Sequence, residues 1–182
     1  MRPLCLSFKL LPPAEVLCGF EGRLAALGCD VSRPYVFDRK RWHQSVSSPF
    51  EEHPGLLERM LRAGDRIDVP EFTLVFDRLS GHSAGEGGIH WLFGIRGQSR
   101  PFNALVNDAR ARLKQEGVHD PSGHRAHVTV SYKAPNAFRT RRMTPVAWPI
   151  REVLLVRGGG DLPAYGVVAR WPLRADPQRT LW

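Results

Sequence analysis

The sequence of 182 residues has only three cysteines, Cys5, Cys18 and Cys29, and none belongs to a CxxC pair. An odd number of widely spaced cysteines argues against a disulfide framework and a zinc knuckle, so a reducing cytoplasm is the default compartment. No apolar run is long enough to span a membrane, and Ser7 and Lys9 break the N-terminal run, which therefore lacks the form of a signal peptide. We expect a cytoplasmic protein with no membrane partner.

Patterns typical of metal and nucleotide sites are also missing. His119, His124 and His127 lie close in sequence, but their spacing is not that of a zinc site and no cysteine accompanies them. The glycine runs GEGG (85–88) and RGGG (157–160) match neither GxxxxGK[ST] nor GxGxxG, and hairpin turns explain them better. The sequence therefore predicts no metal, no cofactor and no nucleoside triphosphate site.

What the chain has in excess is positive charge. Its formal net charge is +8, with 24% charged and 42% hydrophobic residues. The hydrophobic share fits one compact domain over residues 1–182, or two small lobes that fold as one unit. The positive charge favours a polyanionic partner, and RNA, DNA, a phosphorylated metabolite and an anionic surface all qualify.

The spacing of apolar residues predicts a mixture of strands and helices. The predicted strands cover residues 4–10, 41–49, 72–79, 89–97, 126–131, 150–157 and 164–173, and the predicted helices cover about 14–27, 54–63 and 101–117. Turns are expected at 80–88 and 158–161, and a basic loop over 132–149. This order indicates an α+β fold with mostly antiparallel pairing.

The stretch SGHRAHVTVSYKAP (122–135) places a histidine inside an otherwise apolar strand. Because side chains alternate along a strand, His127 and Thr129 would share one face while the valines face the other way. A structural histidine that is satisfied within the core is the alternative.

A second segment, RWHQSVSSP (41–49), repeats this relation in the other half of the chain. If it is extended, His43 and Ser45 share a face, and Trp42, Gln44 and Val46 point the other way. Each copy of His-x-Ser/Thr follows a predicted helix. The bare pattern is not specific, and its weight comes from one copy in each half of a strongly basic chain.

Two histidines and two hydroxyls suit the opening of a cyclic phosphodiester by water. The reaction needs a base for the water proton, an acid for the departing sugar oxygen, and donors for the phosphoryl oxygens. Histidine, with a pKa of about 6.5, can serve as either acid or base at one pH. Hydroxyls on the same face can donate to the phosphate, and no metal is required.

The segments WHQSV (42–46) and HVTVSY (127–132) resemble the motifs of the 2H phosphoesterases, and most closely those of the bacterial 2′-5′ RNA ligase or RNA 2′,3′-cyclic phosphodiesterase group. The resemblance extends over most of the chain, to about residue 172, and implies a two-lobed α+β fold with pseudo-twofold symmetry and a central cleft. It implies that His43 donates a proton to the leaving oxygen and that His127 activates water. Ser45 and Thr129 would hold the phosphate.

The first motif departs from the family at Gln44, where an apolar residue is usual, and at Ser45, where threonine is commoner. After the second motif Tyr132 and Lys133 stand where bacterial ligase-like members often have a basic residue, so Tyr132 is a candidate to bind phosphate or stack on a base. The implied partner is an RNA or oligonucleotide with a terminal cyclic phosphate, and we expect a monomer.

Other functions remain open at this point. Within the family, the reaction could instead be cleavage or formation of 2′-5′ linkages, or hydrolysis of a small cyclic phosphate. Outside it, the chain could be a basic RNA-binding module with structural histidines, a hypothesis to which Gln44 gives some weight.

Overall fold

The computed structural model describes residues 3–29, 32–83, 85, 88–159, 162 and 164–175. The helices are α1 (Ala14–Ala26), α2 (Leu56–Gly64) and α3 (Arg100–Gln115), with a short 3-10 turn at Arg39–Arg41. The strands are β1 (Leu4–Leu10), β2 (Gln44–Ser45), β3 (Phe50–Glu51), β4 (Phe72–Ser83), β5 (Ile89–Gly94), β6 (His127–Ser131), β7 (Phe138–Ile150), β8 (Glu152–Gly159) and β9 (Gly166–Pro172). The predicted α+β class is confirmed.

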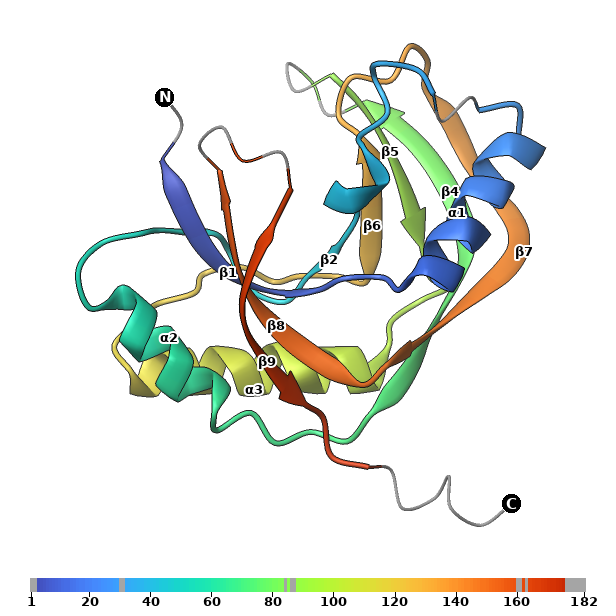
Figure 1. Cartoon of the computed structure of the whole chain (residues 1–182). Coiled ribbons are helices and arrows are strands. Elements are labelled where there is room, and N and C mark those ends of the chain that lie inside the picture. The colour runs from blue at the N-terminus through green and yellow to red at the C-terminus, as the bar shows by residue number, and fades with distance from the viewer. Residues whose placement is uncertain are drawn as a thin grey trace.

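The strands form two antiparallel sheets (Figure 1). In the first sheet the order is β2-β1-β8-β9, and β3 pairs with the start of β1. In the second sheet the order is β6-β5-β4-β7. Each histidine motif thus reaches an edge strand, the first at β2 and the second at β6.

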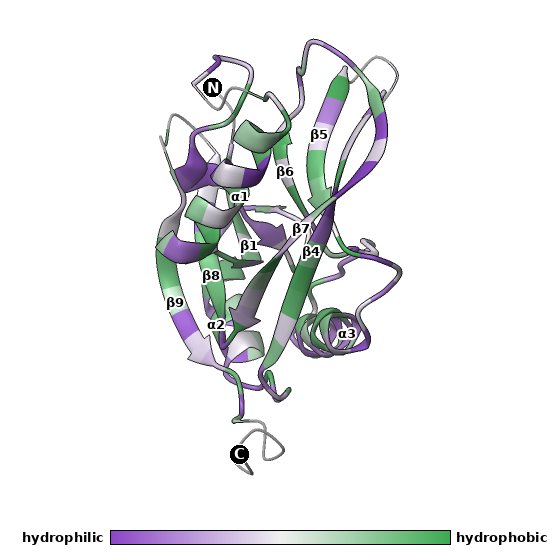
Figure 2. Ribbon diagram, turned by 90° about the vertical axis from the view of Figure 1, so that its right-hand side faces the viewer, coloured by the Kyte–Doolittle hydropathy of each residue, from purple (hydrophilic) through white to green (hydrophobic). Residues whose placement is uncertain are grey.

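The helices cover the sheets where their apolar faces find partners. In α1 the buried residues Val16, Phe20 and Leu24 recur at the spacing of one helix face, and the helix lies against β7 (Figure 1). Gly19 allows this close approach, since a Cβ there would lie 3.1 Å from Val146. Hydrophobic residues run along β1, β8 and β4 inside the two sheets (Figure 2).

The predicted basic loop over 132–149 is wrong, because most of it forms β7. Arginines and two prolines hide this strand from periodicity analysis, and both features belong to sheet edges. β7 is indeed an edge strand, paired only with β4 among the described residues, so neither its charges nor Pro145 and Pro149 have to be accommodated inside the sheet.

Other boundaries also differ from prediction. β4 continues through Ser83, four residues into the predicted turn 80–88, because β5 pairs with it that far. Of the predicted extended piece 41–49 only Gln44–Ser45 is strand, and β3 is an additional short strand. The predicted turn 158–161 lies partly outside the described residues. Within the described part of the chain, no helix is long and apolar enough to cross a membrane.

Candidate active site

The second motif has the alternation that its sequence predicts. Val128 and Val130 are fully buried in the core, whereas His127 and Thr129 are partly exposed on the opposite face of β6. Among the described strands β6 pairs with β5 alone, so its outer edge is left for other contacts. His127 therefore stands at the rim of the second sheet with its side chain outside the core.

The first motif alternates in the same way. Trp42, Gln44 and Val46 are buried, and His43 and Ser45 are partly exposed. His43 precedes the strand, since the chain leaves the 3-10 turn only at Trp42, whose backbone is extended. The extended backbone is enough to keep the predicted faces.

Both histidines are oriented by the same hydrogen bond. Nδ1 of His43 lies 2.8 Å from the carbonyl oxygen of Arg41, and Nδ1 of His127 lies 2.9 Å from that of Arg125. A carbonyl oxygen can only accept, so each Nδ1 carries the hydrogen and each Nε2 is left to exchange protons. The structural repeat therefore extends to Arg-x-His-x-Ser/Thr, a longer match than the one found by sequence analysis.

Gln44 joins the two motifs directly. Its side chain is completely buried, and its Oε1 accepts a hydrogen bond from the backbone N–H of His127. Its Nε2 donates to the carbonyl oxygens of Ser45 at 2.8 Å and Arg125 at 3.1 Å. Gln44 therefore holds the first motif against the second. The strands that carry the two motifs, β2 and β6, are drawn next to each other in Figure 1.

Further hydrogen bonds link the segment that follows β2 to the segment that precedes β6. Asp120, which is 4% exposed, accepts hydrogen bonds from the backbone N–H of Ser48 and from the N–H and hydroxyl of Ser122. Burial alone would raise the pKa of this carboxyl group, but these hydrogen bonds outweigh it and lower the pKa. Asp120 is therefore a charged anchor between the segment that follows β2 and the segment that precedes β6.

Two further side chains next to the first motif were missed by sequence analysis. Lys9 of β1 lies directly across from Ser45, and its Nζ is 3.4 Å from the Ser45 Oγ. The centroid of the Tyr165 ring lies 5.0 Å from the centroid of the His43 ring and 4.9 Å from Nζ of Lys9. Gly158 makes room for this ring, because a Cβ there would lie 2.8 Å from it.

The signals for these residues were weak. Lys9 belongs to the polar face of an alternating strand, a face that is usually solvated. Tyr165 comes from a distant hairpin whose return path cannot be deduced from spacing. Burial raises the pKa of Tyr165 to about 12, so its phenol stays protonated and can donate a hydrogen bond.

Burial and positive charge control the protonation of the first histidine. Burial, with the charge of Lys9 as the next cause, lowers the pKa of His43 to about 3, and the charge of His127 contributes in the same direction. Burial also lowers the pKa of His124, and the charges of His127 and Lys9 add to this effect. In the free protein His43 is therefore neutral at pH 7.

Tyr132 follows β6 and is 47% exposed. Its ring packs against Phe37 at 5.0 Å and against His90 at 4.7 Å. Its predicted contact with phosphate or a base stays a prediction.

A hollow of about 680 Å³ adjoins the second motif. Its lining includes His127, His124 and Arg125, together with Leu92 and Gly94 of β5. Gly94 and Leu92 lie across from His127 and Thr129 in the sheet, so the hollow opens on the face that bears the motif.

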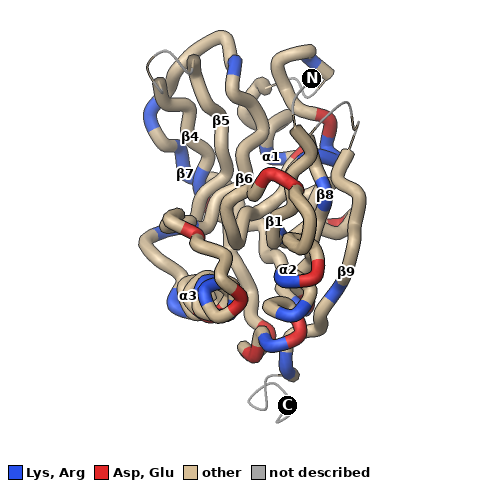
Figure 3. Tube along the Cα trace, turned by 90° about the vertical axis from the view of Figure 1, so that its left-hand side faces the viewer, with Lys and Arg blue, Asp and Glu red and all other residues tan. Residues whose placement is uncertain are grey.

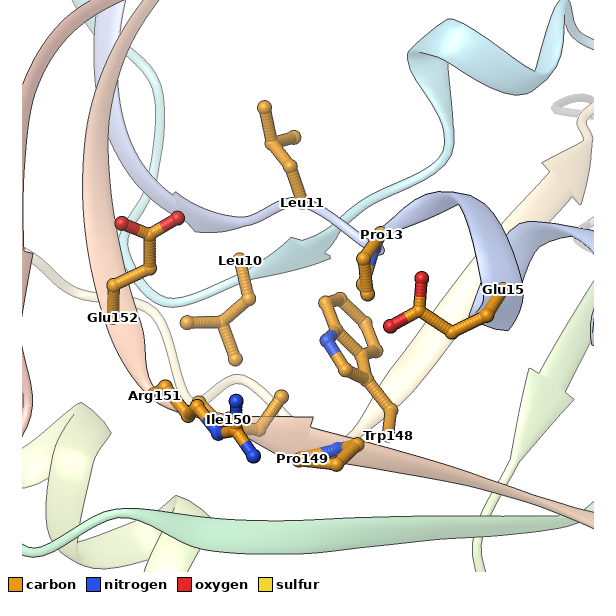
Figure 4. A pocket seen from close by; sticks show the side chains of 9 residues that line it. All are labelled: Leu10, Leu11, Pro13, Glu15, Trp148, Pro149, Ile150, Arg151 and Glu152. Carbon is orange, nitrogen blue, oxygen red and sulfur yellow. The ribbon is translucent and has the colours of Figure 1, made fainter. Parts of the chain in front are cut away.

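A smaller hollow of about 350 Å³ lies elsewhere, between the start of α1 and the turn from β7 to β8 (Figure 4). Glu15 and Glu152 stand at its rim with a single basic residue, Arg151, and none of the predicted site residues lines it. Two carboxylates against one guanidinium make it a poor phosphate site. Among the described residues, no group of three or more His, Cys, Asp or Glu side chains is placed to hold a metal ion.

Solved structures share this fold. Escherichia coli LigT in its apo form is 21% identical, with a TM-score of 0.72 over 96% of this chain and 99% of LigT. A phosphoesterase is 20% identical, with a TM-score of 0.74 over 94% of this chain and 99% of its own. The protein TT0787 of Thermus thermophilus is 22% identical, with a TM-score of 0.68 over 97% of this chain and 100% of its own.

LigT has also been crystallised with NADP⁺, 3′-AMP, phosphate and ATP. No family model matches the sequence, and no curated protein matches it significantly. The likeness in structure therefore establishes the fold of this chain, which is the fold that the sequence predicts.

Proposed function

We propose that this protein is a metal-independent 2H phosphoesterase that hydrolyses 2′,3′-cyclic phosphates at RNA or oligonucleotide ends to 2′-phosphates. The observation that carries the proposal is the matched pair His43 and His127, each with Nδ1 held by the carbonyl of the residue two positions earlier. The LigT fold and the net charge of +8 support a phosphorylated, polyanionic substrate.

The proposed reaction uses the two free Nε2 atoms. One imidazole takes a proton from water as the water oxygen attacks phosphorus, and the other delivers its proton to the ribose 3′-oxygen as the P–O3′ bond breaks. The resemblance assigns the first role to His127 and the second to His43. The hydroxyls of Ser45 and Thr129 donate to the non-bridging oxygens. With a 5′-hydroxyl group in place of water, the same steps would form a 2′-5′ linkage without ATP.

The protonation of His43 fits this scheme only with substrate bound. Its pKa of about 3 belongs to an empty, positively charged site. The negative charge of a phosphodiester opposes the effect of Lys9 and stabilises the imidazolium. The proposed role of His43 as the acid therefore requires that it take up its proton in the complex with substrate.

The test is product analysis on a short RNA that ends in a 2′,3′-cyclic phosphate, incubated in EDTA and followed by mass spectrometry and ³¹P NMR. We expect a 2′-phosphate product from the parent protein, and a rate lower by about 10²- to 10⁴-fold in His43→Ala and in His127→Ala. His119→Ala is the matched control, because His119 is exposed and lines a different hollow although it is near the second motif in sequence.

Turnover by both histidine variants at the parent rate would refute the proposed site. An unchanged cyclic end on RNA that still binds would replace this function with action on another phosphodiester or with RNA binding alone. Retention of RNA affinity in the two variants distinguishes loss of catalysis from loss of binding.

A further inference from the structure

Lys9 is an unusual residue to bury. It lies in the middle of the first sheet, paired with Ser45 of β2 on one side and Leu154 of β8 on the other, and it is only 6% exposed. Lysine is almost never fully buried unless its charge is paired, because an unpaired ammonium loses its hydration. An apolar residue at this position would make the sheet more stable. The presence of a buried amine therefore suggests a functional role.

No carboxylate in the described part of the chain supplies that reason. The ion pairs among the described residues all involve arginine, and none includes Lys9. Within the described residues, Nζ contacts the Ser45 hydroxyl and the face of the Tyr165 ring. Both are neutral, and together they leave the ammonium with unused hydrogen-bonding capacity.

A second polar atom near Lys9 is also unsatisfied. Nε2 of His124 is buried and has no hydrogen-bond partner among the described residues. His124 is close enough for the charge of Lys9 to lower its pKa. An anion beside Lys9 would supply an acceptor to this part of the site and a countercharge to the amine.

We propose that Lys9 is a substrate-binding residue whose ammonium takes a non-bridging oxygen of the phosphate, beside the hydroxyl of Ser45. This inference rests on the proposed function and names the anion that the site accepts. The site offers one point charge, the Lys9 ammonium, and neutral hydrogen-bond donors. This set fits a single phosphate or phosphodiester group. It lacks the planar guanidinium that binds a carboxylate through two parallel hydrogen bonds.

Inorganic phosphate is the probe, and its affinity is measured by calorimetry at pH 7. In Lys9→Met we expect phosphate affinity to fall by about 10- to 100-fold, the range for loss of one charge-assisted hydrogen bond. Lys114→Met is the matched control, because Lys114 is exposed on α3, a helix that carries none of the site residues. Lys9→Arg should retain part of the affinity. Equal affinity in Lys9→Met and the parent would overturn the proposal.

Nuclear magnetic resonance of [¹⁵N]lysine gives a readout that needs neither turnover nor a variant. Among the described residues, the titratable groups around the Lys9 amine are Tyr165, His43 and His124, and none of these three is an anion at pH 7. Burial lowers the pKa of Lys9 to about 8, and phosphate bound beside the amine should raise it. A Lys9 pKa that is unmoved by saturating phosphate would also refute the proposal.

The two proposals can fail separately. Loss of phosphate affinity in Lys9→Met, in a protein that leaves cyclic RNA ends unchanged, supports the Lys9 site and refutes the cyclic phosphodiesterase. Turnover that needs both histidines, with phosphate affinity unchanged in Lys9→Met, supports the enzyme and refutes the role of Lys9.

Discussion

Among the side chains of the site, sequence could predict those whose direction depends only on their neighbours along the chain. The alternation that places His127 and Thr129 together, and His43 with Ser45, is a local property of extended backbone. Lys9 could not be predicted, because its burial depends on a distant hairpin that carries Tyr165 over it. The same alternation that predicts one face as polar does not say whether that face meets solvent or a partner.

The buried amine of Lys9 should make the protein less stable than it could be. Burial lowers the pKa of Lys9 from 10.5 to about 8, so between these pH values the unfolded chain binds more protons than the folded one and stability rises with pH. Below pH 8 the full cost, about 3 kcal/mol, is present. Lys9→Met should therefore have a larger free energy of unfolding than the parent at pH 7, by up to this amount.

Urea unfolding of the two proteins at pH 7 and at pH 10 checks this. The difference between them should shrink at the higher pH, where the parent amine is neutral in the folded state. Lower stability of Lys9→Met at pH 7 would contradict an uncompensated buried charge.

At the scale of elements, the strands that escaped prediction lie at sheet edges. β7 carries arginines and prolines that an inner strand would exclude, and β3, which pairs only with the start of β1 among the described residues, has only two residues. Periodicity over so short or so polar a segment does not stand out from that of a loop. The long, regular elements α1, α3 and β1 were predicted almost to their ends.

The short β2 strand holds the second motif through one side chain, Gln44. Replacement by methionine keeps the volume and removes the bonds to the His127 N–H and to the Arg125 carbonyl. We expect kcat on the cyclic RNA to fall about tenfold with little change in KM, because the His127 ring loses its fixed position while Lys9 and Ser45 remain. Gln115→Met, an exposed change at the end of α3, is the control.

A positioning role for Gln44 and a purely structural one differ in this readout. If Gln44→Met loses only thermal stability and keeps the parent kcat below its melting range, Gln44 does not position His127.

At the scale of the whole molecule, two arginines lie in the row of paired residues that crosses the second sheet from His127. Gly94 lies across from His127, Arg78 lies across from Gly94, and Arg142 of β7 lies across from Arg78. Directly paired residues of neighbouring antiparallel strands share a face, and strands are about 4.8 Å apart, so Arg142 stands about 14 Å from His127 on the same face. Figure 3 shows basic residues along β7, the edge strand of this sheet. A bound RNA chain could run from the histidine to the edge of the sheet.

The residue before Arg142 provides the matched comparison. Arg141 lies across from Leu79, whose side chain is buried on the opposite face, and its guanidinium stacks on Phe138. If RNA follows the face of His127, Arg142→Gln should weaken RNA binding and reduce the slope of log K against log salt by about 0.7, the loss of one phosphate contact to a single strand. Arg141→Gln should leave that slope unchanged. Fluorescence anisotropy with a labelled oligonucleotide at several salt concentrations measures both, and equal slopes for the two variants would mean that RNA does not distinguish the faces of β7.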